Sequence, residues 1–251
     1  MKYVVANWKQ NKSIKEAFSW LEAYKESNPS LPSEVSVVIA PPFTLLAQMR
    51  WFVQTKDIPV LLAAQDISAH EDGAFTGEVG VAQLSDYIDA VIIGHSERRM
   101  YFGENNTSVA QKVAQTIEND LHAFVCIADQ VTADGQVPSE KIDVEKSWYQ
   151  EQITSVFSQI SESNYHNVTL VYEPISAIST FGGVPLTADQ TVTAIKDIQS
   201  LVSEDVAVMY GGSVTADNIA TYWPLDGVSG VMPGGASLKT NDFLAIIQGT
   251  N

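Results

Sequence analysis

Short apolar runs recur along the whole chain, and each is followed by residues with the spacing of an amphipathic helix. The runs are continuous and do not alternate with polar residues, which is typical of strands buried on both faces in a parallel sheet covered by helices. The predicted strands are Lys2 to Ala6, Val35 to Ala40, Val60 to Ala64, Ala90 to Ile93, Ala123 to Ile127, Val168 to Tyr172, Val206 to Tyr210 and Val228 to Met232.

Helical patterns fill the segments between these runs. Ser13 and Thr187 each begin the sequence pattern of a capping box, which marks the start of a helix. A longer amphipathic pattern passes through Ile142, Trp148, Ile153, Phe157 and Ile160. Eight such strand and helix units without a linker predict one (β/α)8 barrel domain over residues 1–251, with a doubly wound sheet as the alternative.

Polar residues and glycines gather where the predicted strands end. In a (β/α)8 barrel the carboxyl ends of the strands carry the functional site. The residues at these ends are Asn7, Lys9, His95, Glu173 and the pairs Gly211-Gly212 and Gly234-Gly235.

Glu173 ends an apolar strand and is followed by Pro174 and a loop that reaches Gly182-Gly183. A carboxylate on a rigid strand end, beside a loop able to fold over it, is the arrangement expected of a general base with a lid. Taken alone, the same pattern also describes a solvated glutamate before an ordinary turn.

The two glycine pairs each lie between a strand and a helix start. Backbone amides without side chains in front of them can approach a phosphate dianion, and the loops after strands seven and eight are the usual phosphate site of such barrels. Lys9 would add positive charge, and Asn7 has the same strand parity and faces the same interior.

His95 lies between a glycine and a predicted helix start at Ser96. The helix dipole there disfavours an imidazolium ion and leaves a neutral ring able to donate a hydrogen bond. His, Cys and carboxylate residues show no metal-ligand spacing, so no metal site is predicted.

The net charge of −16, with 14 basic residues, argues against a nucleic-acid or membrane partner. The single cysteine, Cys126, lies in an apolar run and is expected to be a packed core thiol. The first strand begins at Lys2, no run reaches transmembrane length, and we expect a cytoplasmic protein.

Six motifs in this sequence resemble those of the triosephosphate isomerase family, in the family's order and across essentially the whole chain. They are Asn7-Trp8-Lys9, Gly73-Ala74-Phe75-Thr76-Gly77-Glu78-Val79, Gly94-His95-Ser96-Glu97-Arg98-Arg99, Tyr172-Glu173-Pro174, Tyr210-Gly211-Gly212-Ser213-Val214 and Gly234-Gly235-Ala236-Ser237-Leu238.

The resemblance implies interconversion of dihydroxyacetone phosphate and glyceraldehyde 3-phosphate through an enediolate. This family is itself the standard example of a glutamate base, a neutral histidine and a closing loop, so these roles are carried over from it. Glu173 would move the proton, His95 would bind the substrate oxygens, and Lys9, Asn7 and Glu97 would complete the catalytic group. Amides near Ser179, Ser213, Gly234 and Gly235 would hold the phosphate, and the chemistry needs no cofactor.

The segment from Gly73 to Val79 resembles the family's dimer loop, whose tip, including Thr76, enters the partner subunit. The resemblance therefore implies a homodimer, while the segment alone could be a plain surface turn. Gln10 replaces a smaller or apolar residue that the family usually has in the pocket for this loop, which leaves the strength of the interface open.

The lid differs most from the family. Ser176 replaces a tryptophan, Ser179 a glycine, Phe181 and Gly182 a glycine and a lysine, and Asp129 a glutamate. In the family that glutamate contacts the lid tryptophan, so we expect this lid to close without the contact, supported by Tyr172, Tyr210 and Ser213.

Two other functions stay open at this stage. The changed lid is compatible with a catalytically weakened or inactive barrel that still binds phosphate, and the pocket motifs also suit isomerisation of a related small phosphorylated sugar. The four residues Asn7, Lys9, His95 and Glu173 favour an active isomerase.

Overall fold

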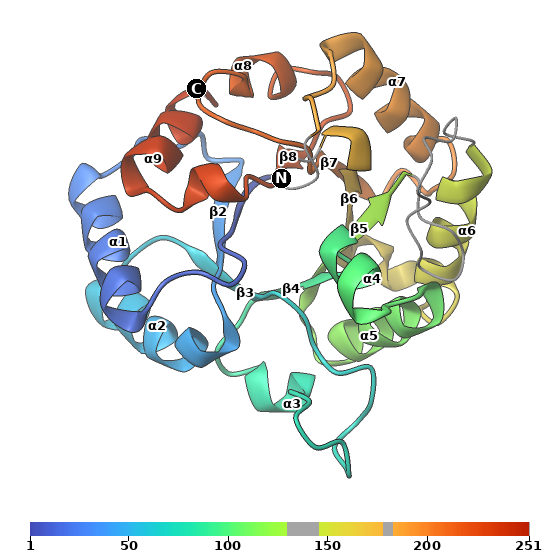
Figure 1. Ribbon diagram of the computed structural model, residues 1–251, viewed down its shortest axis with the longest axis horizontal. Coiled ribbons are helices and arrows are strands. Elements are labelled where there is room, and N and C mark those ends of the chain that lie inside the picture. The colour runs from blue at the N-terminus through green and yellow to red at the C-terminus, as the bar shows by residue number, and fades with distance from the viewer. Residues whose placement is uncertain (130–145, 178–182, 251) are drawn as a thin grey trace.

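The computed structural model describes residues 1–129, 146–177 and 183–250, with the backbone alone for residues 146–148. Within these ranges eight parallel strands pair in sequence order, and the first also pairs with the last, so the sheet closes into a barrel. Figure 1 shows the strands at the centre and the helices in a ring around them. This confirms the predicted (β/α)8 architecture and excludes the open doubly wound sheet.

The strands agree closely with the apolar runs. They are β1 (Lys2–Asn7), β2 (Val35–Ala40), β3 (Leu61–Ala64), β4 (Ala90–Ile93), β5 (His122–Ala128), β6 (Val168–Glu173), β7 (Ala207–Tyr210) and β8 (Gly230–Val231). Only β8 is much shorter than its prediction.

Gly230, the first residue of β8, lies where the barrel closes against β1. Its backbone has a φ of +155°, and an added Cβ would lie 2.3 Å from the carbonyl oxygen of Tyr3 in β1. A side chain at this position would therefore collide with the strand that closes the barrel, so only glycine allows β1 and β8 to approach.

The α-helices follow their strands as the periodicity predicts. They are α1 (Ile14–Ser27), α2 (Phe43–Lys56), α3 (Val81–Leu84), α4 (Ser96–Phe102), α5 (Asn106–Glu118), α6 (Lys146–Phe157), α7 (Ala188–Gln199), α8 (Ile219–Tyr222) and α9 (Thr240–Gln248), with 3-10 turns η1 (Glu162–Asn167), η2 (Ile175–Ala177) and η4 (Gly235–Ser237).

The two predicted capping boxes are present. The Ser13 hydroxyl accepts from the Glu16 amide at the start of α1, and Thr187 and Gln190 make the same exchange at α7. The pattern predicted around α6 is only partly tested, because Ile142 lies outside the described residues and Ile160 follows the end of the helix.

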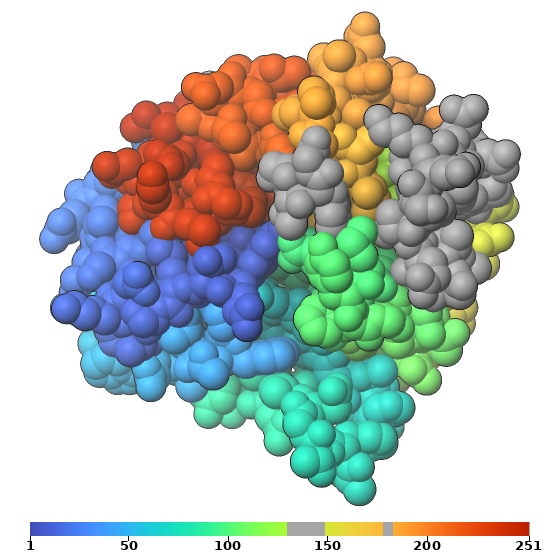
Figure 2. Space-filling model, in the orientation of Figure 1, coloured from blue at the N-terminus to red at the C-terminus, as the bar shows by residue number. Residues whose placement is uncertain are grey.

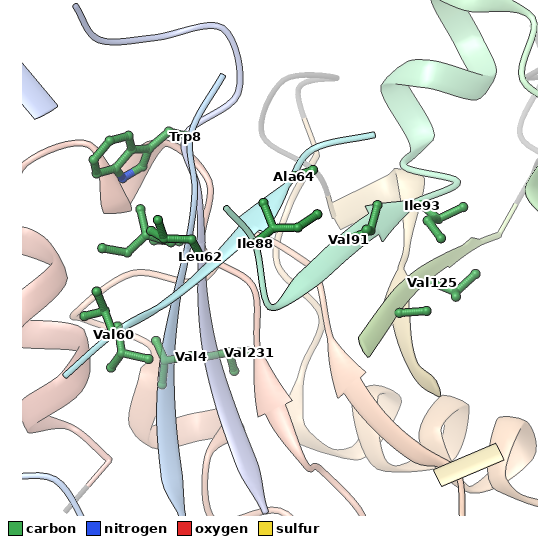
Figure 3. Close-up of a cluster of buried hydrophobic side chains, with 14 of the residues drawn as sticks. Val4, Trp8, Val60, Leu62, Ala64, Ile88, Val91, Ile93, Val125 and Val231 are labelled. Carbon is green, nitrogen blue, oxygen red and sulfur yellow. The ribbon is translucent and has the colours of Figure 1, made fainter. Parts of the chain in front are cut away.

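Alternate residues of the strands face two different apolar layers. One layer lies between the barrel and its helices, and Figure 3 shows part of it, including Trp8, Leu62 and Val125. The other fills the barrel interior and contains Val171 and Cys126. Glu173 is two residues beyond Val171 on β6, so its side chain also points inward, at the mouth of the barrel. The burial of Cys126 confirms it as a core thiol.

A segment around α3 stands out from the wheel of helices. Figure 1 shows it as a protruding loop, and Figure 2 shows it as a separate lobe on the rim. It contains residues 73–79, the segment that resembles a dimer loop, and we call it the 73–79 loop. Among the described helices, none combines the length and the apolar character that a membrane span requires.

Candidate active site

The predicted site residues meet at the carboxyl ends of the strands. A cavity of about 260 Å³ lies there, and residues from five strand ends, those of β1, β4, β6, β7 and β8, border it. The predicted residues that line it are Asn7, Lys9, His95, Glu173, Ser213, Gly234 and Gly235. Glu97 lies beside this group, through its contact with Lys9. Ser179 lies outside the described residues.

Glu173 is held on both carboxylate oxygens. Its Oε2 accepts the backbone N–H of Ser96 at 2.8 Å, and its Oε1 lies 3.1 Å from His95 Nε2. The residue is 2% exposed. The sequence did not indicate the Ser96 contact, because a backbone amide at a helix start leaves no specific residue pattern.

The hydrogen bonds around His95 define its tautomer. Its Nδ1 accepts the backbone N–H of Glu97 at 3.1 Å, as the N-cap of α4. Because Nδ1 is an acceptor, the ring hydrogen lies on Nε2, which donates to Glu173. The start of α4 therefore presents a neutral imidazole to the cavity, as predicted from the helix dipole.

Lys9 is fixed in an unusual backbone conformation. Its φ is +53°, and its amide donates to Asn7 Oδ1 at 3.1 Å. Its Nζ lies 2.5 Å from Glu97 Oε1. A non-glycine residue with positive φ needs support from its surroundings, and strained residues of this kind gather at functional sites.

Gln65 supplies part of that support and was missed from the sequence. Its side-chain amide donates to the carbonyl oxygens of Lys9, at 2.8 Å, and Ala40, at 2.7 Å. The signal that could have indicated it is its place directly after β3, where the other strand ends also carry polar residues.

The glycine loop after β8 presents backbone amides to the cavity. Within the described part of the chain, the N–H groups of Gly234 and Gly235 donate no hydrogen bond. Lys9 is the only cationic side chain among the described residues that line the cavity. A small anion would therefore find its donors between this loop and Lys9.

Ser213 is placed differently from the glycine loop. Its amide donates to the carbonyl oxygen of Ala177 at 3.3 Å, so in this structure it binds the segment after β6. We define the lid loop as residues 176–183. The Tyr210 hydroxyl accepts from Leu186 N, just after this loop, at 3.4 Å. Ser213 therefore contacts the chain at the start of the loop, and Tyr210 contacts the chain after its end. Val184 N also donates to Ser176 O at 3.0 Å, which joins the two ends of the loop.

Two further ionisable groups lie behind Glu173. Burial raises the pKa of the Cys126 thiol well above its usual value, and the negative charge of Glu173 raises it further. Burial lowers the pKa of Arg99, while the carboxylates of Glu104 and Glu173 act in the opposite direction. Glu173 thus has a neutral thiol and a guanidinium behind it.

Fold and site together define the class. The chain is a (β/α)8-barrel protein with a carboxylate, a neutral imidazole and an ammonium group around one cavity at the carboxyl ends of its strands. Among the described residues there is no group of three or more histidine, cysteine or acidic side chains able to hold a metal ion.

Comparison with known proteins narrows the class to one family. A family model described as triosephosphate isomerase matches residues 2–250. The triosephosphate isomerase of Alkaliphilus oremlandii is 36% identical over 254 residues, which cover 98% of each chain. That of Chlamydia trachomatis serovar D is 37% identical over 98% of this chain and 89% of its own, and that of Lactiplantibacillus plantarum is 32% identical over 99% and 98%. The chain belongs to the triosephosphate isomerase family, and it is an isomerase.

Proposed function

We propose that the chain interconverts dihydroxyacetone phosphate and D-glyceraldehyde 3-phosphate, with Glu173 as the base that moves the proton. Family membership supports the reaction, which belongs to glycolysis and gluconeogenesis. The observation that carries the assignment of the base is the contact of 3.1 Å between Glu173 Oε1 and His95 Nε2 at the border of the cavity. A base and a hydrogen-bond donor side by side suit proton transfer between adjacent carbons, one of which carries a carbonyl oxygen.

Glu173 must exchange partners to act. Both of its oxygens are occupied in this structure, by Ser96 N–H and by His95 Nε2. A substrate in the cavity would replace the His95 contact and free one oxygen for the carbon-bound proton. Burial of the carboxylate keeps water away from the place where the carbon-bound proton would be transferred.

His95 and Lys9 stabilise the charge that develops on the substrate oxygens. The Nε2–H of a neutral His95 donates to these oxygens as the enediolate forms, and the ring carries no positive charge of its own. Lys9 offsets the growing negative charge, and Glu97 holds its ammonium group at 2.5 Å. Asn7 orients Lys9 by accepting its backbone N–H.

The phosphate of the substrate would lie between Lys9 and the loop after β8. The amides of Gly234 and Gly235 are the donors that favour this position. Ser213 would join them once its amide leaves Ala177, and Ser179 is assigned to the same group by family resemblance alone. No cofactor enters the proposed reaction.

An assay of glyceraldehyde 3-phosphate isomerisation, coupled to reduction of dihydroxyacetone phosphate, tests this function. We expect Glu173→Gln to lower kcat by about 10²–10⁴-fold, which is the usual contribution of a general base to the rate. Glu204→Gln, at an exposed site away from the cavity, is the matched control and should keep full activity.

The assay also separates the alternatives. Wild-type protein with no activity above that of Glu173→Gln would instead support a phosphate-binding barrel without catalysis. Turnover of a related phosphorylated sugar at a higher kcat/KM would change the substrate and keep the proposed base.

We also propose that residues 1–251 form one domain and that the protein is a cytoplasmic homodimer. A second cavity of about 430 Å³ borders Lys9 and Gln10 and has Tyr101 and Phe102 on its rim, 60% and 70% exposed. Exposed aromatic side chains around a cavity favour a partner surface. The 73–79 loop of a second copy, on which Phe75 is exposed, would bring an apolar side chain to this cavity. Sedimentation at several concentrations distinguishes a dimer from a monomer.

A further inference from the structure

A buried aspartate lies at the start of the lid loop. Asp129 directly follows β5, and the register that pairs Ala128 with Glu173 brings it beside the end of β6. Its Oδ1 accepts the backbone N–H of Ile175 at 2.5 Å. Ile175 is the second residue after Glu173 and the first of the turn η2 that leads into the lid loop. The carboxylate therefore contacts the chain between the proposed base and its lid.

Helix α6 holds this aspartate in place from two directions. Gln152 accepts the N–H of Ala128 at 3.1 Å and donates to its carbonyl oxygen at 2.7 Å, which fixes the backbone just before Asp129. The Tyr149 hydroxyl donates to the Tyr172 hydroxyl at 3.2 Å, and Tyr172 lies against the Asp129 carboxylate. Position and direction of the carboxylate are thus both set by a helix that does not touch the cavity.

In the part of the chain that the structure describes, no cation neutralises the charge of Asp129. Among the described residues, the ionisable groups that face it are the phenols of Tyr149, Tyr172 and Tyr210. Burial raises the pKa of Asp129 to about 6, while the N–H of Ile175, its own N–H and the Tyr172 hydroxyl lower it. The carboxylate that remains at neutral pH is therefore stabilised by hydrogen bonds, of which the one to Ile175 is charge-assisted and correspondingly strong.

We propose that Asp129 is a positioning residue for the isomerase reaction, which fixes the start of the lid loop through Ile175 N–H and so sets the direction of Glu173. Only Pro174, with its restricted φ, separates Glu173 from the anchored amide. Rotation of the backbone at Glu173 would pull Ile175 N–H away from a carboxylate that cannot follow it. The proposal rests on the proposed role of Glu173 as the base.

This changes what the sequence led us to expect. Aspartate in place of the family's glutamate and Ser176 in place of its tryptophan remove the side-chain contact of the family, which predicts a lid that closes without that contact. In the structure the shorter aspartate instead reaches the backbone beside Ser176. The lid loop therefore lacks the side-chain contact of the family, but the hydrogen bond from Ile175 N–H to Asp129 anchors its start and does not depend on the side chain at position 176.

Kinetics of two substitutions test the proposal. Asp129→Ala removes the acceptor, and we expect kcat at pH 7.5 to fall about 10–100-fold while KM changes less than about 3-fold. Asp129→Asn keeps a neutral oxygen toward Ile175 N–H and should recover most of that loss. Below about pH 6 the wild-type carboxylate becomes protonated, so the ratio of wild-type to Asp129→Asn kcat should fall toward one.

Hydrogen exchange gives a readout that does not depend on turnover. We expect the Ile175 amide, followed in a peptide of residues 170–177 by mass spectrometry, to exchange about 10–100-fold faster in Asp129→Ala than in wild type. Asp205→Asn, an exposed aspartate before β7, is the matched control for both measurements.

The outcomes separate this proposal from the function on which it rests. Folded Asp129→Ala with kcat within twofold of wild type, or with unchanged exchange at Ile175, overturns the positioning role. Wild-type protein without isomerase activity overturns the proposed function, and the exchange measurement then still decides whether Asp129 anchors the loop.

Discussion

Gly211 directly follows β7 and lies against the side chain of Glu173, so we expect Gly211→Ala to displace the proposed base. An alanine Cβ at this position would lie 2.8 Å from Val171 Cγ1, 3.0 Å from Glu173 Cγ and 3.1 Å from the Tyr172 carbonyl oxygen. Carbon atoms in contact prefer about 3.5–4.0 Å, so the overlap with the Glu173 side chain is about 0.5–1 Å. The φ of Gly211 lies outside the left-handed region, which makes the effect steric and not a matter of backbone strain.

The neighbours of Gly211 decide which atoms move. Val171 is packed inside the barrel, and the Tyr172 carbonyl oxygen accepts Gly211 N–H at 2.7 Å, so both are fixed by the sheet. The Glu173 side chain faces the cavity and yields more easily. A displacement of about 1 Å of a catalytic group costs about 10²-fold in rate, which corresponds to about 2.7 kcal/mol in the activation barrier. Overpacking also lowers the free energy of unfolding by about 1–3 kcal/mol.

The coupled isomerase assay and urea unfolding measure the two effects. We expect kcat of Gly211→Ala to fall about 10–100-fold with a modest loss of stability. Gly80→Ala is the matched control, since its Cβ would meet only the far ends of two flexible side chains, Asp72 Oδ1 at 3.3 Å and Gln83 Oε1 at 3.8 Å. A folded Gly211→Ala protein with kcat within threefold of wild type would refute the reasoning, because the base would then tolerate the displacement that the geometry requires.

Two further predictions follow from buried or paired carboxylates. Glu97→Gln removes the charge that holds Lys9 Nζ, and we expect kcat/KM to fall about tenfold; an unchanged value in the same assay would show that Lys9 needs no partner. Burial raises the pKa of both Asp66 and Asp129 to about 6, above the value of about 3.9 in an unfolded chain, so the folded state retains protons that the unfolded state has lost. The free energy of unfolding should therefore fall as the pH rises from about 4 to about 6. Measured by urea unfolding at pH 4.5 and 7, this fall should be smaller in Asp129→Asn than in wild type. An equal fall in both proteins contradicts the raised pKa of Asp129.

The barrel could be predicted from sequence because its strands carry a signal of their own. Each continuous apolar run became a strand, and β2 and β4 have the predicted bounds. The limit of this signal appears at β8, where the run from 228 to 232 yields a strand of two residues. The close approach to Tyr3 that restricts Gly230 depends on how the barrel closes, and that is a contact between the two ends of the chain.

The site could be predicted only as far as side chains identify it. Asn7, Lys9, His95 and Glu173 were found from their places at strand ends and from family resemblance. The contacts that hold them use backbone groups: Ser96 N–H on Glu173, the Lys9 carbonyl oxygen on Gln65, and Ile175 N–H on Asp129. Every residue has a backbone carbonyl oxygen and every residue except proline has a backbone N–H, so no pattern of residues marks these contacts in advance.

The acidity of the protein bears directly on how it binds an anionic substrate. A net charge of −16 repels a phosphate at long range, but salt screens that repulsion beyond about 10 Å at 0.1 M ionic strength. Inside the cavity the balance is local, and Lys9 is already paired with Glu97. Lys9 alone therefore cannot compensate the charges of Glu97, Glu173 and a phosphate dianion, and backbone amides have to add stabilisation; among the described residues those of Gly234 and Gly235 donate no hydrogen bond and are placed to do so. On this argument backbone amides, with those of the glycine loop after β8 among them, and not the lysine alone, decide whether the phosphate is held.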